Sequence, residues 1–376
     1  MNPSSVRRAA IPAIAALALG LGLSGCGAAN EQSGNGGGGA TGQPANAAGN
    51  LSGTLNGAGS TAQQAAQDGW TAKFQGANPN VTINYDPVGS GGGVDQFLAG
   101  GVQFAGSDAY LTTDQVSQSK KACGGQTAIE VPDYISPIAL VYNVKGVSNL
   151  RLTPDTVAKI FAGKITQWND PAIKATNPGV NLPSERITPV HRSDDSGTTE
   201  NFTDYLHQAA SRSWTYPAAE TWPIKSGEGA DGTSGVIAAV SKGAGTIGYA
   251  DASQAGQLSM AQVKVGSSWV GPTAQAASKA AGLSKPVSGR SANDMAISVD
   301  RTTTQSGAYP LVLISYLISC PSYSDANTAK LVKSYLTYIV SSQGQQVAAQ
   351  VAGSAPLPSN LSQQASTQLS SISAKG

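Results

Sequence analysis

The segment HRSDDSGTTENF, residues 191–202, brings a serine, a histidine and several acidic residues close together in the sequence. Ser196 could be the nucleophile of a hydrolase, which needs a base within hydrogen-bond reach and an acid that orients this base. The same hydroxyl and N–H groups could instead surround an anion at the start of a helix. The two hypotheses make different demands on His191 and Arg192.

Neither histidine of the chain suits a catalytic triad with Ser196. His191 precedes Ser196 by five residues at the end of an expected strand, and its side chain points away from the turn if that of Arg192 points inward. His207 follows Ser196 on an expected helix, roughly 15 Å along its axis. The sequence contains no GxSxG motif of the kind found in α/β-hydrolases. The spacing therefore favours a serine that holds a ligand, and no catalytic residue is expected.

Three turns of small residues share one pattern, because each follows an expected strand and precedes an expected helix. They are Gly57-Ala58-Gly59-Ser60-Thr61, Gly89-Ser90-Gly91-Gly92-Gly93 and Ser193-Asp194-Asp195-Ser196-Gly197-Thr198. Such turns direct unpaired N–H groups and hydroxyls beyond the helix N-terminus, where the helix dipole favours negative charge. In open α/β sheets these loops gather at the carboxyl ends of the strands. Together the three turns predict an oxyanion site.

The elements expected around these turns are those of an α/β protein. Residues 51–110 alternate between short strands and helices, which predicts a mostly parallel sheet. The apolar run at residues 135–143 predicts a strand covered on both faces. Thr153, followed by a proline and an acid, marks a helix start. The apolar segment at residues 309–320 is too short to span a membrane and predicts a buried strand or helix, and periodic Leu and Ile after residue 358 predict a surface helix.

The N-terminal segment has the features of a bacterial lipoprotein leader. Two arginines precede an apolar run, and Leu23-Ser24-Gly25-Cys26 resembles a lipobox. We therefore expect a signal peptide at residues 1–25 and a lipidated, palmitate-bearing Cys26. A plain secretory signal with an incidental cysteine and a membrane helix are the alternatives. Residues 26–50 are rich in Gly, Ala and Asn and predict a flexible tether between the membrane and a folded part outside it.

Composition narrows the class of the folded part. Only 12% of residues are charged and the net charge is +1, so a nucleic-acid-binding surface is not expected. After lipidation of Cys26, two cysteines remain, Cys123 and Cys320, which outside the cell could form one disulfide or stay as two buried thiols. Neither lies in a zinc-binding pattern, so no metal site is expected.

Longer motifs carry a resemblance to a known family, the phosphate-binding lipoproteins that serve ABC-type phosphate importers. The resemblance extends from about residue 51 to 358. Its motifs are LNGAGST, VGSGGGV, FAGSDAYLT, FAGKITQWNDPAI, NPGVNLPSERITPVHRSDDSGTT and GTIGYAD. The set, in this order, is specific to that family.

The resemblance implies a two-lobed periplasmic-binding-protein-like fold of type II, with mixed sheets, flanking helices and two crossover hinge strands. Lobe I would comprise residues 51–138 and 300–376, and lobe II residues 139–299. It further implies a monomer that closes over one dehydrated phosphate and passes it to the permease subunits of an importer. No cofactor is implied. The chain would be located at the extracytoplasmic face of the cell membrane.

The family's phosphate contacts fall on eight residues of this sequence, one of them through its main-chain N–H. These positions are Thr61, the N–H of Ala62, Ser90, Asp108, Arg192, Ser196, Gly197 and Thr198. Asp194 is placed to pair with Arg192 and hold its orientation. Two positions depart from the family pattern: Ala62 replaces a frequent aromatic residue, and Asp195 replaces a glycine, which adds a carboxylate beside the site.

Elementary chemistry gives these residues distinct tasks. Hydroxyls and N–H groups can bind a dehydrated phosphate without a large net charge, and Arg192 supplies one planar charged fork. Ionised Asp108 only accepts hydrogen bonds, so it favours a ligand that carries a proton. Phosphate carries one at neutral pH and sulfate does not, which predicts selectivity for phosphate. A sulfate-binding protein and a sensor without a transporter remain alternatives.

Overall fold

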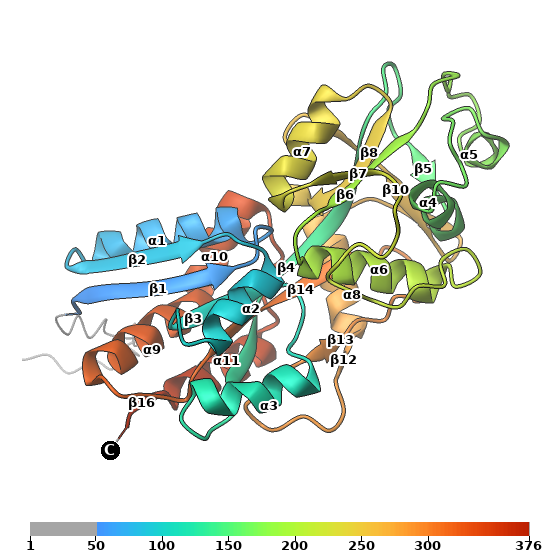
Figure 1. Ribbon diagram of the computed structural model, residues 1–376. Helices are drawn as coiled ribbons and strands as arrows, with labels where there is room; N and C mark the ends of the chain where they lie inside the picture. Colours follow the sequence, from blue (N-terminus) through green and yellow to red (C-terminus); the bar gives the residue numbers. More distant parts are fainter. Residues whose placement is uncertain (1–50, 376) are drawn as a thin grey trace, which may run out of the picture. The chain divides into compact units, whose positions relative to one another are not determined.

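The computed structural model describes residues 51–375 (Figure 1). These residues belong to one unit of the chain, residues 48–376. The expected signal peptide, Cys26 and tether lie outside the described residues. Among the described residues, no helix is both long enough and apolar enough to cross a membrane.

A nine-stranded mixed sheet organises the fold (Figure 1). In spatial order its strands are β2 (Val81–Asp86), β1 (Gly53–Gly59), β3 (Phe104–Ser107), β14 (Val312–Ser319), β4 (Ile129–Asn143), β8 (Thr246–Asp251), β6 (Thr188–Arg192) and β7 (Glu228–Ala230), with β9 (Ser259–Met260) beside β4. We call β1, β2 and β3 the β1 side, and β6, β7 and β8 the β6 side.

The sheet is parallel only toward its two ends. β1 runs parallel to β2 and β3, and β6 runs parallel to β7 and β8. In the middle, β14 is antiparallel to β3 and β4, and β4 is antiparallel to β8. The expectation of a mostly parallel sheet is therefore wrong in the centre. It was based on residues 51–110, whereas β14 returns from the C-terminal third of the chain and enters in the opposite direction.

Strand β4 connects the two sides of the sheet. Its first part, residues 129–137, pairs with β14, and its second part, residues 138–143, pairs with β8. The apolar run at 135–143 is a covered strand, as predicted, but the strand begins six residues earlier at Ile129. The buried acids Glu130 and Asp133 conceal this earlier start in the sequence, because buried strands are expected to be apolar.

Helices cover the faces of the sheet. They are α1 (Gln64–Ala77), α2 (Ser90–Leu98), α3 (Thr113–Ala122), α4 (Pro154–Phe161), α5 (Pro171–Thr176), α6 (Gly197–Ala209), α7 (Gly232–Lys242), α8 (Ala274–Leu283), α9 (Ala326–Val340), α10 (Ser342–Ala352) and α11 (Ser359–Ser370), with a 3-10 turn η1 (Ala252–Gln254). On the β1 side, α2 packs on β1 and β3 while α1 lies against α10. On the β6 side, α7 packs on β6 and β8.

Local sequence signals explain several helix boundaries. The Thr153 hydroxyl caps α4 by accepting a hydrogen bond from the Thr156 N–H at 3.1 Å, with proline in the first turn, as predicted. The predicted C-terminal helix is α11, which buries Ala365 and Leu369. The apolar segment at 309–320 contains β14, whose residues are all buried.

The remaining strands form small separate sheets. They are β11 (Ser268–Val270), β10 (Gln262–Val265) and β5 (Arg151–Leu152), the pair β12 (Lys285–Pro286) and β13 (Ile297–Ser298), and the pair β15 (Ser322–Tyr323) and β16 (Ser373–Ala374). A disulfide joins Cys123, after α3, to Cys320, after β14, with the two Cα atoms 5.1 Å apart. The bond lies in an apolar cluster with Val94, Phe97 and Ile318.

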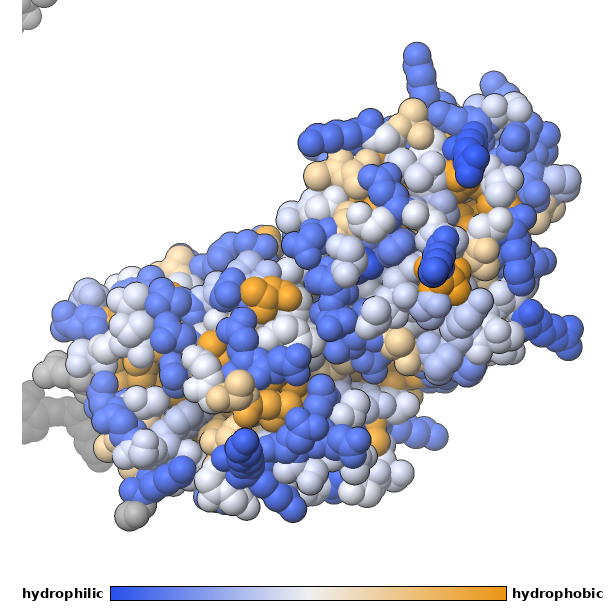
Figure 2. All heavy atoms as spheres, viewed as in Figure 1, coloured by the Kyte–Doolittle hydropathy of each residue, from blue (hydrophilic) through white to orange (hydrophobic). Residues whose placement is uncertain are grey.

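The surface is polar in character. Figure 2 shows hydrophilic and hydrophobic residues interspersed over the visible face. Among the described residues, the large apolar side chains that are exposed are scattered through the sequence: Tyr216, Met260, Leu283 and Val351. Single exposed apolar residues of this kind are normal for a protein surface and do not by themselves indicate a docking site.

Candidate anion-binding site

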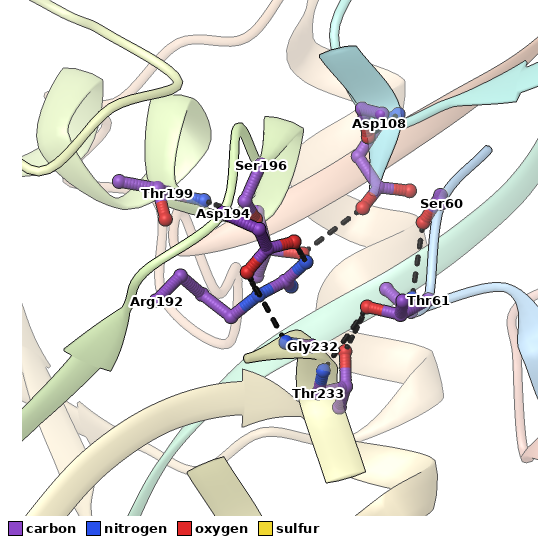
Figure 3. A network of polar contacts seen from close by, with 12 residues as sticks. Ser60, Thr61, Asp108, Arg192, Asp194, Ser196, Thr199, Gly232 and Thr233 are labelled. Atoms are coloured by element: carbon purple, nitrogen blue, oxygen red, sulfur yellow. Dashed lines mark hydrogen bonds and ion pairs between the residues drawn. The ribbon is translucent and has the colours of Figure 1, made fainter. Parts of the chain in front are cut away.

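The three turns predicted from the sequence meet between the β1 side and the β6 side, because the Gly89 N–H donates to the Gly59 carbonyl at 3.0 Å and the Gly91 N–H donates to the Asp195 carbonyl at 3.3 Å. Figure 3 shows two of these turns, through Ser60 and Thr61 and through Asp194 and Ser196. Thr198, at the start of α6, donates its hydroxyl to Asp108 Oδ2 at 3.0 Å. Asp108, which follows β3, donates its main-chain N–H to the hydroxyl of Ser90, the first residue of α2, at 3.0 Å. Residues from distant parts of the sequence are thus brought together at the ends of strands, as expected for ligand sites in α/β sheets.

Two glycines make this close approach possible. A Cβ on Gly197 would lie 2.8 Å from both the Ala109 N and the Ser90 Oγ, so no larger residue fits there. Gly89, the N-cap of α2, has a φ of 89°, which side-chain-bearing residues rarely adopt. The N-termini of α2 and α6 can therefore both lie close to the Asp108 loop, where the two helix dipoles favour negative charge.

Arg192 is the cation of the site and is held in place by Asp194. The guanidinium is only 2% exposed. Its Nε donates to Asp194 Oδ1 at 2.7 Å, and Nη2 donates to Asp194 Oδ2. The Gly232 N–H also donates to Asp194 Oδ1, at 3.1 Å. Burial raises the pKa of Asp194, but the hydrogen bonds and charge of Arg192 outweigh this and leave the pKa below its ordinary value. The pairing expected from the two-residue spacing is present, and it fixes the fork in one orientation.

Asp108 is the buried carboxylate of the site. It is 2% exposed and accepts hydrogen bonds from the Thr198 hydroxyl and, at 2.8 Å, from the Ser315 hydroxyl of β14. Burial raises the pKa of Asp108, and these hydrogen bonds together with the positive charge of Arg192 counteract part of the rise. A carboxylate held among donors in this way can accept one further proton-bearing group.

Thr61 and Ala62 lie at the turn after β1. Thr61 is joined to α7, because its hydroxyl lies 2.9 Å from that of Thr233 and accepts the Thr233 N–H at 3.0 Å. The Ala62 N–H donates to the Ser60 hydroxyl at 3.0 Å, a bond that a ligand would have to share or replace. The Gln254 amide donates to the Thr61 carbonyl at 2.8 Å and closes the turn from the β6 side.

Asp195, the departure from the family pattern, does not face the site. Its side chain is exposed, and its Oδ1 accepts a hydrogen bond from the Thr221 hydroxyl at 2.8 Å. Its main-chain carbonyl accepts the Gly91 N–H at 3.3 Å. The extra carboxylate is therefore directed away from Arg192 and Asp108, and solvent screens its charge.

Gly232 and Thr233, at the start of α7, belong to the site but were missed by the sequence analysis. Gly232 donates to Asp194 and Thr233 donates to Thr61, and both lie in a region rich in Gly, Ala and Ser, where the helical pattern is weak. The signal was nevertheless present: Asp231-Gly232-Thr233 is a fourth turn of small residues before a helix. Ser315 carried no comparable signal, because it is one hydroxyl within an apolar strand.

The hydrolase hypothesis has no support in the geometry. The Ser196 hydroxyl caps α6 by accepting the Thr199 N–H at 3.2 Å. The His191 Nδ1 donates to the Arg192 carbonyl at 2.8 Å, and its ring stacks on Trp222 with centroids 4.8 Å apart. The Nδ1 of His207, near the C-terminal end of α6, is buried without a hydrogen-bond partner. Neither histidine is thus placed as a base for Ser196.

Residues 51–375 also contain no group of three or more His, Cys, Asp or Glu side chains that could hold a metal ion. The arrangement that the site offers is one guanidinium, several hydroxyls, helix N-termini and a single buried carboxylate. Its chemistry is that of binding an anion which can donate one hydrogen bond.

Comparison with known proteins identifies the family. The profile of the PBP superfamily domain matches residues 44–343. The chain is 37% identical over 367 residues to the phosphate-binding protein PstS 3 of Mycobacterium leprae, covering 96% of this chain and 98% of that protein. It is 38% identical over 351 residues to the phosphate-binding protein PstS 2 of Mycobacterium tuberculosis, covering 89% and 94%.

A solved structure shares the fold. The structure of the high affinity periplasmic phosphate-binding protein PfluDING, bound with phosphate, matches with a TM-score of 0.70 at 24% identity and covers 82% of this chain and 92% of that one. The predicted α/β, periplasmic-binding-protein-like fold is thereby confirmed. The chain belongs to the PBP superfamily and, within it, to the family of the phosphate-binding PstS proteins.

Proposed function

We propose that this protein binds inorganic phosphate at the candidate site and delivers it to the permease subunits of an ABC-type phosphate importer. The relatives that carry the name phosphate-binding protein align over nearly their whole length with this chain. The observation that carries the proposal is Asp108, a buried carboxylate surrounded by donors in a site built for an anion. Such a carboxylate would be unfavourable next to an anion that has no proton to share.

The proposed ligand contacts divide the four oxygens of phosphate between the two sides of the site. The Thr61 and Ser90 hydroxyls and the Ala62 N–H serve it from the β1 side. From the β6 side, Arg192 supplies a charged fork, and the Ser196-Gly197-Thr198 turn supplies hydroxyls and helix N–H groups. Asp108 accepts a hydrogen bond from the protonated oxygen of the ligand, which discriminates phosphate from sulfate.

We further propose that binding is coupled to closure of two lobes, residues 51–138 with 300–376 and residues 139–299. The two-part pairing of β4, first with β14 and then with β8, supports a crossover at about residue 138. Cross-site bonds such as Thr61 to Thr233 would form on closure and break on release. Strands that continue through a crossover can act as a hinge with small changes in backbone angles.

The proposed cellular context is a monomer at the extracytoplasmic face of the membrane, anchored by lipidated Cys26 through the tether at 26–50. A lipid anchor would keep the receptor close to a permease. A phosphate sensor would use the same binding chemistry, so binding alone does not establish delivery to a permease. Delivery is tested by measuring phosphate uptake in cells that lack the chromosomal gene for this protein and carry the Cys26→Ser variant.

Calorimetric titration of the purified chain, freed of bound anion, tests the binding proposal. Phosphate is expected to bind tightly at neutral pH, and sulfate is expected to give no heat. Asp108→Asn should narrow the difference between the two anions, because an amide can donate to sulfate. Binding of sulfate in preference to phosphate, or no phosphate heat from folded protein, would overturn the proposal.

A further inference from the structure

Asn201, one turn into α6, joins the Asp108 loop to the Ser196-Gly197-Thr198 turn. Its side chain is 8% exposed. The Nδ2 group donates to the Asp108 carbonyl at 2.6 Å and to the Gly197 carbonyl at 2.8 Å. Asn201 therefore bridges the main chain that carries the buried carboxylate and the main chain of the α6 turn.

Arg301 orients this amide from the other side. Its Nη2 donates to Asn201 Oδ1, which fixes which end of the amide faces the two carbonyls. Arg301 is 3% exposed, and its Nη1 donates to the carbonyls of Pro310 at 2.9 Å and Val312 at 2.7 Å. The guanidinium thus links α6 to the start of β14, the strand whose Ser315 donates to Asp108.

The charge of Arg301 is compensated at a distance from the anion. Its Nε pairs with Asp204 Oδ2 at 2.9 Å, on the outward face of α6, where Asp204 is 28% exposed. A cavity of about 120 Å³ adjoins the network and is lined by Asn201, Arg301 and Asp108, among others. Loss of either side chain would therefore admit water between α6 and the Asp108 loop, rather than let the loops collapse together.

The roles of Asn201 and Arg301 follow from their donor and acceptor patterns. An asparagine amide both donates and accepts, so it can serve two carbonyls and one guanidinium at once. A leucine at the same place would leave the buried Asp108 carbonyl unpaired, and an aspartate would bring a negative oxygen against it. Lysine cannot reproduce the planar fork of arginine.

We propose that Asn201 and Arg301 are positioning residues, which hold the Asp108 loop against the Ser196-Gly197-Thr198 turn and thereby keep the anion enclosed. The inference builds on the proposed phosphate-binding function. It assigns the pair to the closed state, so their loss accelerates release of the anion and leaves its entry nearly unchanged.

The test measures phosphate association and dissociation rates, by stopped flow on the purified full chain, for the wild type and the Asn201→Ala variant. The buried Asp108 carbonyl loses its partner and the link to the α6 turn is broken, so the dissociation rate is expected to rise roughly 10- to 100-fold. The association rate is expected to stay within about threefold. A general loss of structure would not produce this division between the two rates.

Asn177→Ala is the matched control. Asn177 is also buried, and its Nδ2 likewise donates to two carbonyls, those of Arg151 and Ile173, but it lies at the end of α5. We expect both Asn177→Ala and Asn201→Ala to lower thermal stability, but the phosphate dissociation rate of Asn177→Ala should stay within about threefold of wild type.

Arg301→Lys and the double variant test the link between the two residues. Because both act on one bridge, the double variant should lose no more affinity than the more affected single variant. If Asn201→Ala does not fold, Asn201→Ser and Arg301→Lys take its place in the same assay. Folded variants with wild-type dissociation rates, or losses that add in the double variant, would overturn the inference, whereas a wild type that does not bind phosphate overturns the proposed function instead.

Discussion

The two sides of the site differ in the means by which they would hold an anion. The β1 side presents the hydroxyls of Thr61 and Ser90 with the carboxylate of Asp108. Figure 3 shows Thr61 and Asp108 of this side. The β6 side presents Arg192, locked by Asp194, and the N-terminus of α6. One side offers dipoles and a proton acceptor, and the other offers the positive charge. In the proposed site, the proton acceptor that would select a protonated ligand and the cation that would attract negative charge thus come from opposite sides.

Removal of Arg192 should reduce phosphate affinity more than any other change to the site. Arg192→Met removes the cation of the β6 side and leaves the partly buried Asp194 carboxylate without its charged partner. Phosphate affinity is expected to fall by roughly 1,000-fold or more, as for the loss of one partner of a buried charge pair. Calorimetric titration measures the loss. Arg192→Lys, which keeps the charge but loses the fork, should give an intermediate value, and equal affinities for the two variants would show that charge has no part in binding.

Loss of the disulfide, which lies on the β1 side, should lower the stability of the fold without changing phosphate affinity. The bond closes a loop of 197 residues between Cys123 and Cys320. The double variant Cys123→Ser/Cys320→Ser is expected to lower the free energy of unfolding by about 3–4 kcal/mol, measured by denaturant titration. Phosphate affinity should stay within about threefold, because the bond packs among Val94, Phe97 and Ile318. A larger loss of affinity would show that the cluster positions the site.

Thr198→Val tests the hydrogen bond between the two sides, because Thr198 belongs to the β6 side but donates to Asp108 of the β1 side. The variant keeps the shape of the side chain and removes its hydroxyl. We expect phosphate affinity to fall roughly 10- to 100-fold, since a buried carboxylate loses one donor. Ser193→Ala, an exposed hydroxyl of the same turn, is the control. No change for Thr198→Val would contradict a role of the cross-site bond.

Glu220 gives the smallest expected effect and tests the electrostatics at the edge of the site. Burial, with the charges of Glu200 and Asp195, raises the pKa of Glu220 to about 8. The ordinary value is 4.5, so the folded chain holds this proton more tightly than the unfolded chain does. Its contribution to stability is therefore fully present below about pH 4.5 and is lost as the pH rises toward about 8.

Glu220→Gln removes this titration. The decrease in the free energy of unfolding between about pH 5 and 8 should become shallower by on the order of 2 kcal/mol, a value reduced because solvent reaches the side chain. Denaturant titrations across this pH range measure it. Glu228→Gln, an exposed carboxylate on β7, should leave the pH profile unchanged. A pH profile of Glu220→Gln identical to that of the wild type would contradict the raised pKa of Glu220.

Much of the β1 side could be predicted from the sequence, because its information is local. The turns at Thr61 and Ser90 each lie between a periodic strand and a periodic helix, and a strand that enters a helix through small residues predicts both the elements and the donors. The pairing of Arg192 with Asp194 was also local, since two residues separate them. Family resemblance then gave Asp108 a role that a lone turn aspartate would not suggest.

What could not be predicted depends on contacts between distant segments. Ser315 and Arg301 come from the C-terminal third of the chain, and only the antiparallel entry of β14 brings them to Asp108 and α6. Asn201 occupies a helix position whose apolar neighbours indicate a core face, so its bridging bonds carry no local signal. Gly232 and Thr233 lie in a region rich in small residues, where the periodic spacing of apolar residues that indicates a helix is weak.

A crystal structure of the chain with phosphate tests the central claim most directly. The account predicts one phosphate between the β1 side and the β6 side, in contact with Thr61, Ser90, Arg192 and the Ser196-Gly197-Thr198 turn. One phosphate oxygen should lie within hydrogen-bond distance of Asp108. A phosphate bound elsewhere, or bound at this site with Asp108 turned away from it, would contradict the account.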